Sequence, residues 1–210
     1  MKSGDYTNYG TGLRACEQLV KLGFSAAARY WGRRIVTMAA IVDEFQKALQ
    51  VGPAEIEIAY QRLGSPAAPP VLLVMGVGGQ LIHWPEEFCH ALVHHGLQVI
   101  RFDNRDSGLS THFADAPTPN LPAVLAGDHS SASYTLSDMG HDAVGLLDHL
   151  GIGRAHIVGA SMGGQIAQTV AIEHPDRVRS LTSMMATTGD QRVGQASPEV
   201  LRELFGEHGR

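Results

Sequence analysis

An uninterrupted apolar run over residues 71–75 constrains the fold more than any other feature of the chain. Successive side chains of a strand point to opposite faces of a sheet, so a run that is apolar throughout needs cover on both faces. Central strands of parallel sheets have this pattern. The run is far too short to cross a bilayer, and glycines follow it. We therefore expect an α/β domain.

The segments around this run alternate between strand-like and helix-like patterns. Strands are expected over residues 55–60, 97–102, 156–158 and 178–185, and helices over residues 86–95, 135–150 and 162–174. Thr135 and Asp138 form a capping pattern at the start of the second helix, and Pro175 stops the third. Residues 111–133, rich in Pro, Ser, Ala and Thr, are expected to be a loop. This alternation predicts a doubly wound α/β fold with a mostly parallel sheet and helices on both faces.

The hydrophobic pattern changes near residue 52. Before that point apolar side chains recur every three or four residues, which predicts helices. They are Leu13, Cys16, Val20, Phe24, Ala27, Trp31, Ile35, Met38, Val42, Phe45 and Leu49. We expect residues 1–52 to be a helical extension and residues 53–210 to be the α/β core. Basic residues outnumber acidic ones over 1–34, and we expect the extension to pack on the core or on a partner subunit. Binding of residues 13–49 to an anionic membrane is the alternative.

Composition excludes several classes of protein. The chain is 44% hydrophobic and 18% charged, as expected of a globular domain. A net charge of -5 and a pI near 6.1 argue against nucleic acid as a partner. Only Cys16 and Cys89 are present, which excludes a disulfide scaffold and a four-cysteine zinc site. Residues 2–12 are polar and lack the apolar stretch of a secretory signal, so we expect a cytoplasmic protein.

The turn at residues 159–164 carries the clearest chemical signal. Its sequence Gly-Ala-Ser-Met-Gly matches G-x-S-x-G and lies between an expected strand and an expected helix, the context of a nucleophile elbow. In so tight a turn, side chains at 159 and 163 would collide with neighbouring backbone. Ser161 is then expected at the apex, with its hydroxyl above the sheet. A serine that merely caps the helix is the alternative.

A second glycine-rich segment, residues 76–79, directly follows the central apolar run. Acyl transfer needs two backbone N–H donors aimed at the carbonyl oxygen of the substrate. Met162, at the start of the helix, can supply one donor, and Val77 in the glycine segment can supply the other. Gly76 and Gly78 would let the backbone approach the substrate closely. An ordinary flexible loop is the alternative.

Three segments taken in order, residues 73–85, 99–106 and 156–164, resemble the α/β-hydrolase superfamily in its serine-esterase and lipase branch. They are similar to aclacinomycin-methylesterase-like and mycobacterial lipase/esterase-like proteins. The resemblance extends over residues 54–190 and leaves residues 1–52 without a counterpart.

This resemblance implies a serine hydrolase that acts on small carboxylic esters and needs no metal or organic cofactor. Ser161 would be the nucleophile, and the backbones of Val77 and Met162 would form the oxyanion hole. Gly76, Gly78 and His83 would contact the substrate.

The base and the acid of a catalytic triad are harder to place. The family orders its triad Ser, then Asp or Glu, then His. After Ser161, Asp190 and His208 are weak candidates, and His208 is third from the end. We therefore expect a chain that lacks the late strands, most of the lid and both triad partners, and that is impaired as an esterase. A non-catalytic binding or interaction protein is the alternative.

Upstream residues offer other polar groups near the expected site. We expect His83 to be a rim or substrate-contact residue rather than the base. Asp103 and Arg105 are expected to hold the rim of the site, with a catalytic acid and an anion clamp as the alternative. The remaining histidines are expected on helix surfaces or in a strand. They are His90, His94, His95, His141, His149, His156 and His174.

The strand expected at residues 178–185 would leave an unpaired sheet edge. Such an edge is prone to pair with another chain. We expect a homo-oligomer formed through this edge or through the N-terminal helices.

Overall fold

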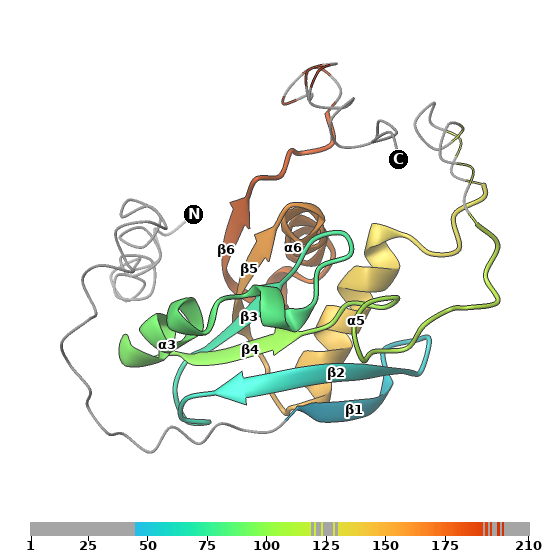
Figure 1. Cartoon of the computed structure of the whole chain (residues 1–210). Helices are drawn as coiled ribbons and strands as arrows, with labels where there is room; N and C mark the ends of the chain where they lie inside the picture. The colour runs from blue at the N-terminus through green and yellow to red at the C-terminus, as the bar shows by residue number, and fades with distance from the viewer. Residues whose placement is uncertain are drawn as a thin grey trace, which may run out of the picture.

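The computed structural model describes residues 45–190 apart from 119, 121–122, 124–127 and 129, and also residues 192, 194, 197 and 199. A mixed sheet with helices around it forms this part of the chain (Figure 1). The strands are β1 (Gln46–Val51), β2 (Ile56–Leu63), β3 (Pro70–Val74), β4 (Gln98–Phe102), β5 (Ala155–Ala160) and β6 (Val178–Met184). The helices are α3 (Glu86–His94), α5 (Leu136–His149) and α6 (Met162–Glu173), with short 3-10 turns η1 (Leu81–His83) and η2 (Pro175–Arg177).

The strand order in the sheet is β1-β2-β4-β3-β5-β6. Strands β4, β3, β5 and β6 are parallel to one another. At one edge, β2 pairs antiparallel with β4, and β1 pairs antiparallel with β2. The expected α/β architecture with a mostly parallel sheet is therefore confirmed. The carboxyl ends of β3, β4 and β5 meet at one edge of the sheet, which is where parallel α/β sheets place their sites.

Strand β3 shows why its run had to be apolar. All five of its residues are buried. Leu72 and Val74 belong to the core that α5 and α6 cover, whereas Val71 and Leu73 belong to the core that α3 covers. Helices therefore lie on both faces of the sheet, as expected, and β3 contacts both layers (Figure 1).

The start of α5 follows the expected capping pattern. The backbone N–H of Asp138 donates to the Thr135 hydroxyl over 3.2 Å, and the Asp138 carboxylate accepts from the Thr135 N–H over 2.7 Å. Two backbone donors at the helix start are thus satisfied reciprocally. The third helix, α6, ends at Glu173, and Pro175 follows in η2, also as expected.

The helical expectation for the residues just before 52 is wrong. Residues 46–51 form β1, which pairs with β2, so the sheet begins before residue 53. A register shift between Ala48 and Val51 places both side chains in the core although they are three residues apart. Phe45 and Leu49, which contributed to the apparent helical spacing, are exposed. The apparent helical spacing thus joined two exposed residues and did not mark the buried positions of the strand, which are Ala48 and Val51. Residues 1–44 of the expected extension lie outside the described residues.

Strand β6 forms the other edge of the sheet in the described part of the chain. Its residues alternate between exposed and half-buried, and the Leu181 side chain is 40% exposed. None of the described helices is both long enough and apolar enough to cross a membrane.

Candidate active site

Ser161 occupies a sharp turn between β5 and α6. Its backbone angles are φ 56° and ψ −127°, and a positive φ is uncommon for any residue other than glycine. The Ser161 N–H donates to the Met184 carbonyl over 2.9 Å, which ties the turn to the end of β6. A strained strand-to-helix turn of this kind is what a nucleophile elbow requires.

Glycine is required on both sides of this serine. A Cβ atom on Gly159 would collide with backbone atoms of Gly163 and Gly164. A Cβ atom on Gly163 would collide with the carbonyl groups of Val74 and Met75 at the end of β3. The predicted backbone collisions at 159 and 163 are therefore confirmed, and they show how closely α6 approaches the sheet.

The Ser161 side chain does not act as a helix cap. The residue lies at the N-cap position of α6, but its hydroxyl accepts no capping hydrogen bond, and the residue is exposed. A serine N-cap normally has extended backbone angles and accepts a bond from the first turn. The hydroxyl is thus left available to a molecule that approaches from solvent.

The glycine segment after β3 lies directly beside Ser161. A Cβ atom on Gly76 would come within 2.9 Å of the Ser161 Cβ and 3.3 Å of its Oγ, so only glycine fits there. The Gly79 N–H donates to the Gly76 carbonyl over 3.1 Å and closes a turn, in which Gly78 has a φ of 65°. Val77 stands at the tip of this turn with its side chain 79% exposed.

Met162 is the first residue of α6, on the carboxyl side of Ser161. The first N–H groups of a helix have no acceptor within the helix, and they form the positive end of its dipole. The Met162 backbone follows the serine directly, and the turn that contains Val77 begins at Gly76, which lies against it. An anion that developed beside Ser161 would lie at the positive end of α6.

The loop after β4 holds the glycine segment in place. The buried carboxylate of Asp103 accepts from the Leu81 N–H over 2.6 Å and from the Leu109 N–H over 2.9 Å. Asn104 donates to the Met75 carbonyl over 2.8 Å, and Ser107 donates to the Gly79 carbonyl over the same distance. Asp103 thus has the rim-holding position expected of it, with both carboxylate oxygens engaged by backbone.

Arg105 takes part in the packing around α5. Its guanidinium forms a bidentate ion pair with Asp142, at 2.6 Å and 2.8 Å, and both side chains are buried. The rings of Phe113 and Tyr134 lie 5.4 Å and 5.0 Å from the guanidinium carbon. Burial acts to lower the pKa of Arg105, but the hydrogen bonds and charge of Asp142 outweigh it and raise that pKa. Arg105 therefore anchors the rim loop to α5 and is not an anion clamp.

The candidates for the base and the acid are engaged elsewhere. His83 is exposed, and its Nδ1 accepts from the Gln80 N–H over 3.0 Å within η1. Asp190 pairs with Arg192 over 2.6 Å near the surface. His208 lies outside the described residues. Over the described part of the chain, no imidazole hydrogen-bonds to the Ser161 hydroxyl.

The other histidines mostly have the surface positions expected of them. His90, His94 and His95 are exposed along α3 and at its end, and His149 is exposed on α5. His156 lies in β5, where its Nδ1 is 2.7 Å from the Ser180 hydroxyl. Burial, together with the charge of Arg179, lowers the pKa of His156. The remaining two, His141 on α5 and His174 after α6, lie side by side.

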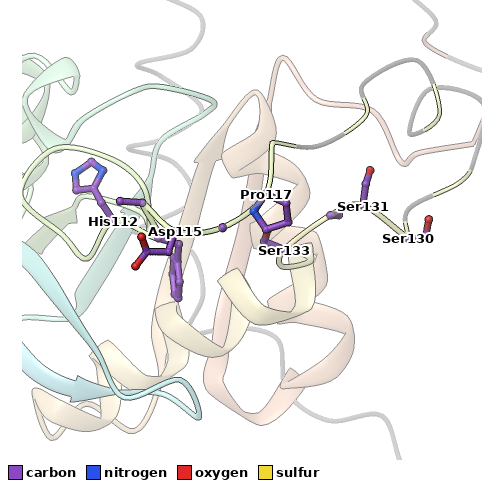
Figure 2. A pocket seen from close by; sticks show the side chains of 10 residues that line it. His112, Asp115, Pro117, Ser130, Ser131 and Ser133 are labelled. Atoms are coloured by element: carbon purple, nitrogen blue, oxygen red, sulfur yellow. The ribbon is translucent and has the colours of Figure 1, made fainter.

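A separate cavity of about 590 Å³ lies between residues 112–117 and 130–133 (Figure 2). His112, Asp115 and three serines contribute its polar lining. Ser161 is not among the lining residues, so this hollow is distinct from the elbow.

Comparison with known proteins gives the family. A family model described as the alpha/beta hydrolase fold matches residues 69–209. The chain belongs to the alpha/beta hydrolase fold family. This membership agrees with the sheet order, the strained turn at Ser161 and the helices on both faces.

Three proteins illustrate what this α/β hydrolase resembles. Rhodomycin D methylesterase DnrP of Streptomyces peucetius is 34% identical over 131 residues, which are 62% of this chain and 39% of that protein. A protein of Variovorax paradoxus named putative carbamate hydrolase RutD is 33% identical over 127 residues, 60% of this chain and 41% of that one. A hydrolase of known structure from Pseudomonas aeruginosa superposes with a TM-score of 0.57 and 25% identity, over 77% of this chain and 51% of that chain.

This α/β hydrolase spans about two-fifths of the length of the curated relatives that it matches. The matched portion includes the elbow and the glycine segment, because the family match begins at residue 69. The matched segment therefore contains the turn at Ser161, the loop beside it and strands β3 to β6.

Sequence reasoning missed two parts of the site in this α/β hydrolase. Asn104 and Ser107 hold the glycine segment, and no pattern pointed to that role. Asp142 was also missed, although a signal existed: it falls among apolar positions of α5, between Met139 and Ala143. A buried carboxylate requires a partner, and a search for one could have led to Arg105.

Proposed function

We propose that this chain carries the nucleophile and oxyanion hole of a serine hydrolase that acts on carboxylic esters. The observation that carries the proposal is Ser161 itself: a non-glycine residue at φ 56°, exposed, without a capping bond, and in contact distance of Gly76. Family membership and the similarity to proteins named methylesterase and carbamate hydrolase support the same class of reaction.

In this proposal the Ser161 Oγ attacks the carbonyl carbon of the ester and its proton passes to a base. The carbonyl oxygen becomes an oxyanion that accepts hydrogen bonds from the Val77 and Met162 N–H groups. Collapse of the intermediate releases the alcohol, which takes up the proton, and leaves an acyl group on Ser161. Water then attacks the acyl group, releases the acid and restores the serine. Gly76, Gly78 and His83 would border the substrate.

The base is the part of this mechanism that the described residues do not supply. Serine is a weak nucleophile at neutral pH until an imidazole takes its proton. Within residues 45–190 as described, His83, His112 and His156 make their hydrogen bonds to other groups. We therefore propose that the 210-residue chain, tested by itself, hydrolyses esters slowly.

Labelling and turnover test the two halves of the proposal separately. A fluorophosphonate probe in large excess should modify Ser161 of the purified chain slowly, because the oxyanion-hole amides assist the attack while no described imidazole does. Ser161→Ala should abolish this modification without changing the melting temperature. Hydrolysis of p-nitrophenyl acetate should stay within about tenfold of the Ser161→Ala variant, because the described residues place no base beside Ser161. Efficient turnover that depends on Ser161 would contradict the second half only, whereas failure to label Ser161 would contradict the first.

A non-catalytic binding or interaction protein is the second candidate. The observation that favours it is the absence of any imidazole on Ser161 among the residues described, together with the engagement of Asp190 by Arg192. On that reading the probe would leave Ser161 unmodified even at long exposure.

In a third candidate arrangement, a second copy of the chain supplies the base that the described residues do not place beside Ser161. The half-exposed β6 edge is a surface through which another chain could pair. Turnover per molecule would then rise steeply with protein concentration. Constant turnover on dilution to a monomer would argue against this arrangement.

A further inference from the structure

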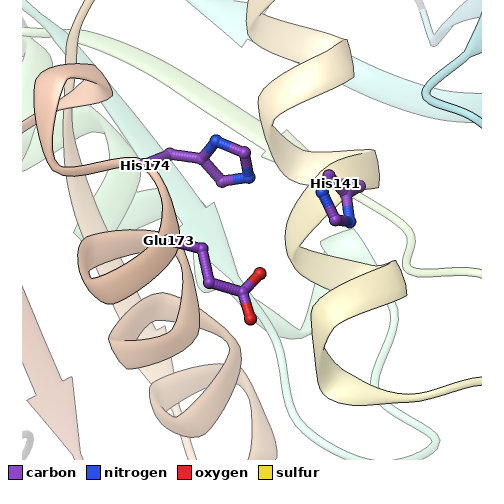
Figure 3. Close-up of side chains that lie close together, drawn as sticks. All are labelled: His141, Glu173 and His174. Carbon is purple, nitrogen blue, oxygen red and sulfur yellow. The ribbon is translucent and has the colours of Figure 1, made fainter.

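We propose that His141, Glu173 and His174 form a binding site for a divalent transition-metal ion such as Zn²⁺, which would link α5 to the end of α6. One ring nitrogen from each histidine and one carboxylate oxygen of Glu173 lie within 4.8 Å of one another. Figure 3 shows the Glu173 and His174 side chains extending from the end of α6 toward His141 on α5. Nothing in the ester-hydrolysis proposal uses these three residues.

The ring of His174 provides a second, independent observation. Its Nε2 atom is buried and has no hydrogen-bond partner. Nearly all buried polar atoms in proteins have a partner, so this nitrogen calls for one. The His141 and His174 rings meet edge-on, with their centroids 5.1 Å apart and their planes at 78°. A bound metal ion would give an unpartnered imidazole nitrogen the electron-pair acceptor that it lacks.

The donor set selects the class of metal. Two imidazoles and one carboxylate suit Zn²⁺ and its first-row neighbours, whereas Ca²⁺ and Mg²⁺ prefer shells of oxygen ligands. At metal–ligand distances of about 2.0–2.2 Å, tetrahedral ligand atoms are about 3.4 Å apart. Small side-chain rotations from the present separations therefore close the site. Three protein ligands leave a fourth position for water.

The surroundings orient the ligands and favour a cation. The Ser137 hydroxyl on α5 donates to Glu173 Oε2 over 2.8 Å, which holds the carboxylate toward α5. Hydrogen bonds of this kind fix the orientation of metal ligands. The carboxylates of Asp138 and Asp142 are near enough to His141 for their charges to interact with it. The charge of Asp142 is already balanced by Arg105, so Asp138 is the acidic group that favours a cation on the α5 side.

The position of the site indicates a structural role. Glu173 is the last residue of α6 and Ser161 precedes the first, so the helix separates them by about 18 Å at 1.5 Å per residue. An ion at Glu173 would therefore not contact a substrate at Ser161. It would hold α5 and α6 together on one face of the sheet, and it should stabilise the fold without being needed for labelling of the serine.

Zinc titration of the EDTA-treated full chain tests the site. We expect one Zn²⁺ per chain by calorimetry, and a rise in melting temperature of about 5 °C or more at Zn²⁺ concentrations about one hundred times the dissociation constant. Co²⁺ in the same site should give the visible absorption of a tetrahedral complex. His141→Ala and Glu173→Gln should each weaken Zn²⁺ binding at least about tenfold and remove the thermal shift.

The matched control is a variant of another adjacent histidine pair. His94→Ala combined with His95→Ala, at the exposed end of α3, should leave both the affinity for Zn²⁺ and the thermal shift unchanged. Glu173→Gln preserves the shape of the side chain, which separates loss of the ligand from loss of folding. A wild-type chain that binds no Zn²⁺, or equal binding by wild type, His141→Ala and Glu173→Gln, would overturn the proposal.

Discussion

Gly163 lies against the carbonyl groups of Val74 and Met75, so closely that a methyl group at position 163 has no room. The start of α6 therefore rests on the end of β3, the strand from which the glycine segment leaves. This contact fixes the distance between Ser161 and the loop beside it. The spacing between Ser161 and the glycine segment therefore depends on backbone contacts.

Gly163→Ala should destabilise the protein by about 3 kcal/mol or more, because backbone atoms cannot move aside as a flexible side chain can. Urea unfolding followed by circular dichroism measures the effect. Gly153→Ala is the matched control: nothing lies within 4 Å of its added Cβ. That variant should change the free energy of unfolding by less than about 1 kcal/mol. Equal stability of the two variants would contradict the packing described here.

Asp142→Ala should destabilise the fold by about 3–5 kcal/mol, because it leaves the buried guanidinium of Arg105 without its counter-charge. Arg105→Met combined with Asp142→Leu should cost less than the single substitution, since no unpaired charge stays in the core. Denaturant unfolding of Arg105→Met, Asp142→Leu and the variant that combines them gives the coupling energy. Additive effects would show that the bidentate pair contributes little.

Asp103→Asn should weaken the rim of the site. The amide retains one acceptor oxygen, so one of the two N–H groups bound by the carboxylate, on Leu81 or Leu109, loses its acceptor. We expect a loss of about 1–3 kcal/mol in stability and slower fluorophosphonate labelling of Ser161. Asp115→Asn, at an exposed position, should change neither. An unaltered labelling rate in Asp103→Asn would show that the rim does not affect the reactivity of Ser161.

Cys89 should make stability fall at high pH. Burial is the main cause that raises the pKa of its thiol from 9.0 to about 11. The unfolded thiol therefore loses its proton first, and the stabilisation, complete below about pH 9, is lost as the pH rises toward 11. Cys89→Ser removes the titrating group. Urea unfolding over this pH range should show a steeper loss in the wild type than in Cys89→Ser, and parallel curves would refute the assignment.

The elements that could be predicted from the sequence are those with local signals. The apolar run of β3, the Thr135–Asp138 capping pair and the glycines around Ser161 each act over a few residues, so their effects can be read in order along the chain. Strand β1 was missed because Phe45 and Leu49, whose spacing suggested a helix, are exposed, while the bulge between Ala48 and Val51 breaks the alternation that marks a strand.

Contacts between distant segments could not be predicted in the same way. Arg105 and Asp142 are 37 positions apart and meet because α5 packs beside the rim loop. His141 and His174 each look like residues on a helix surface, and only the packing of α5 against α6 brings them together. The crossing of two helices depends on the packing of many side chains, which no single motif records.

Main-chain atoms of Gly163, Val74 and Met75 bring the turn at Ser161 against the strand end beneath it. Side chains that line the surrounding space, apart from Asp103, Asn104 and Ser107, can therefore be exchanged in the course of evolution without shifting the hydroxyl or the amides next to it. If the proposed function holds, such a scaffold can accept new acyl groups while the attacking oxygen of Ser161 keeps the same position.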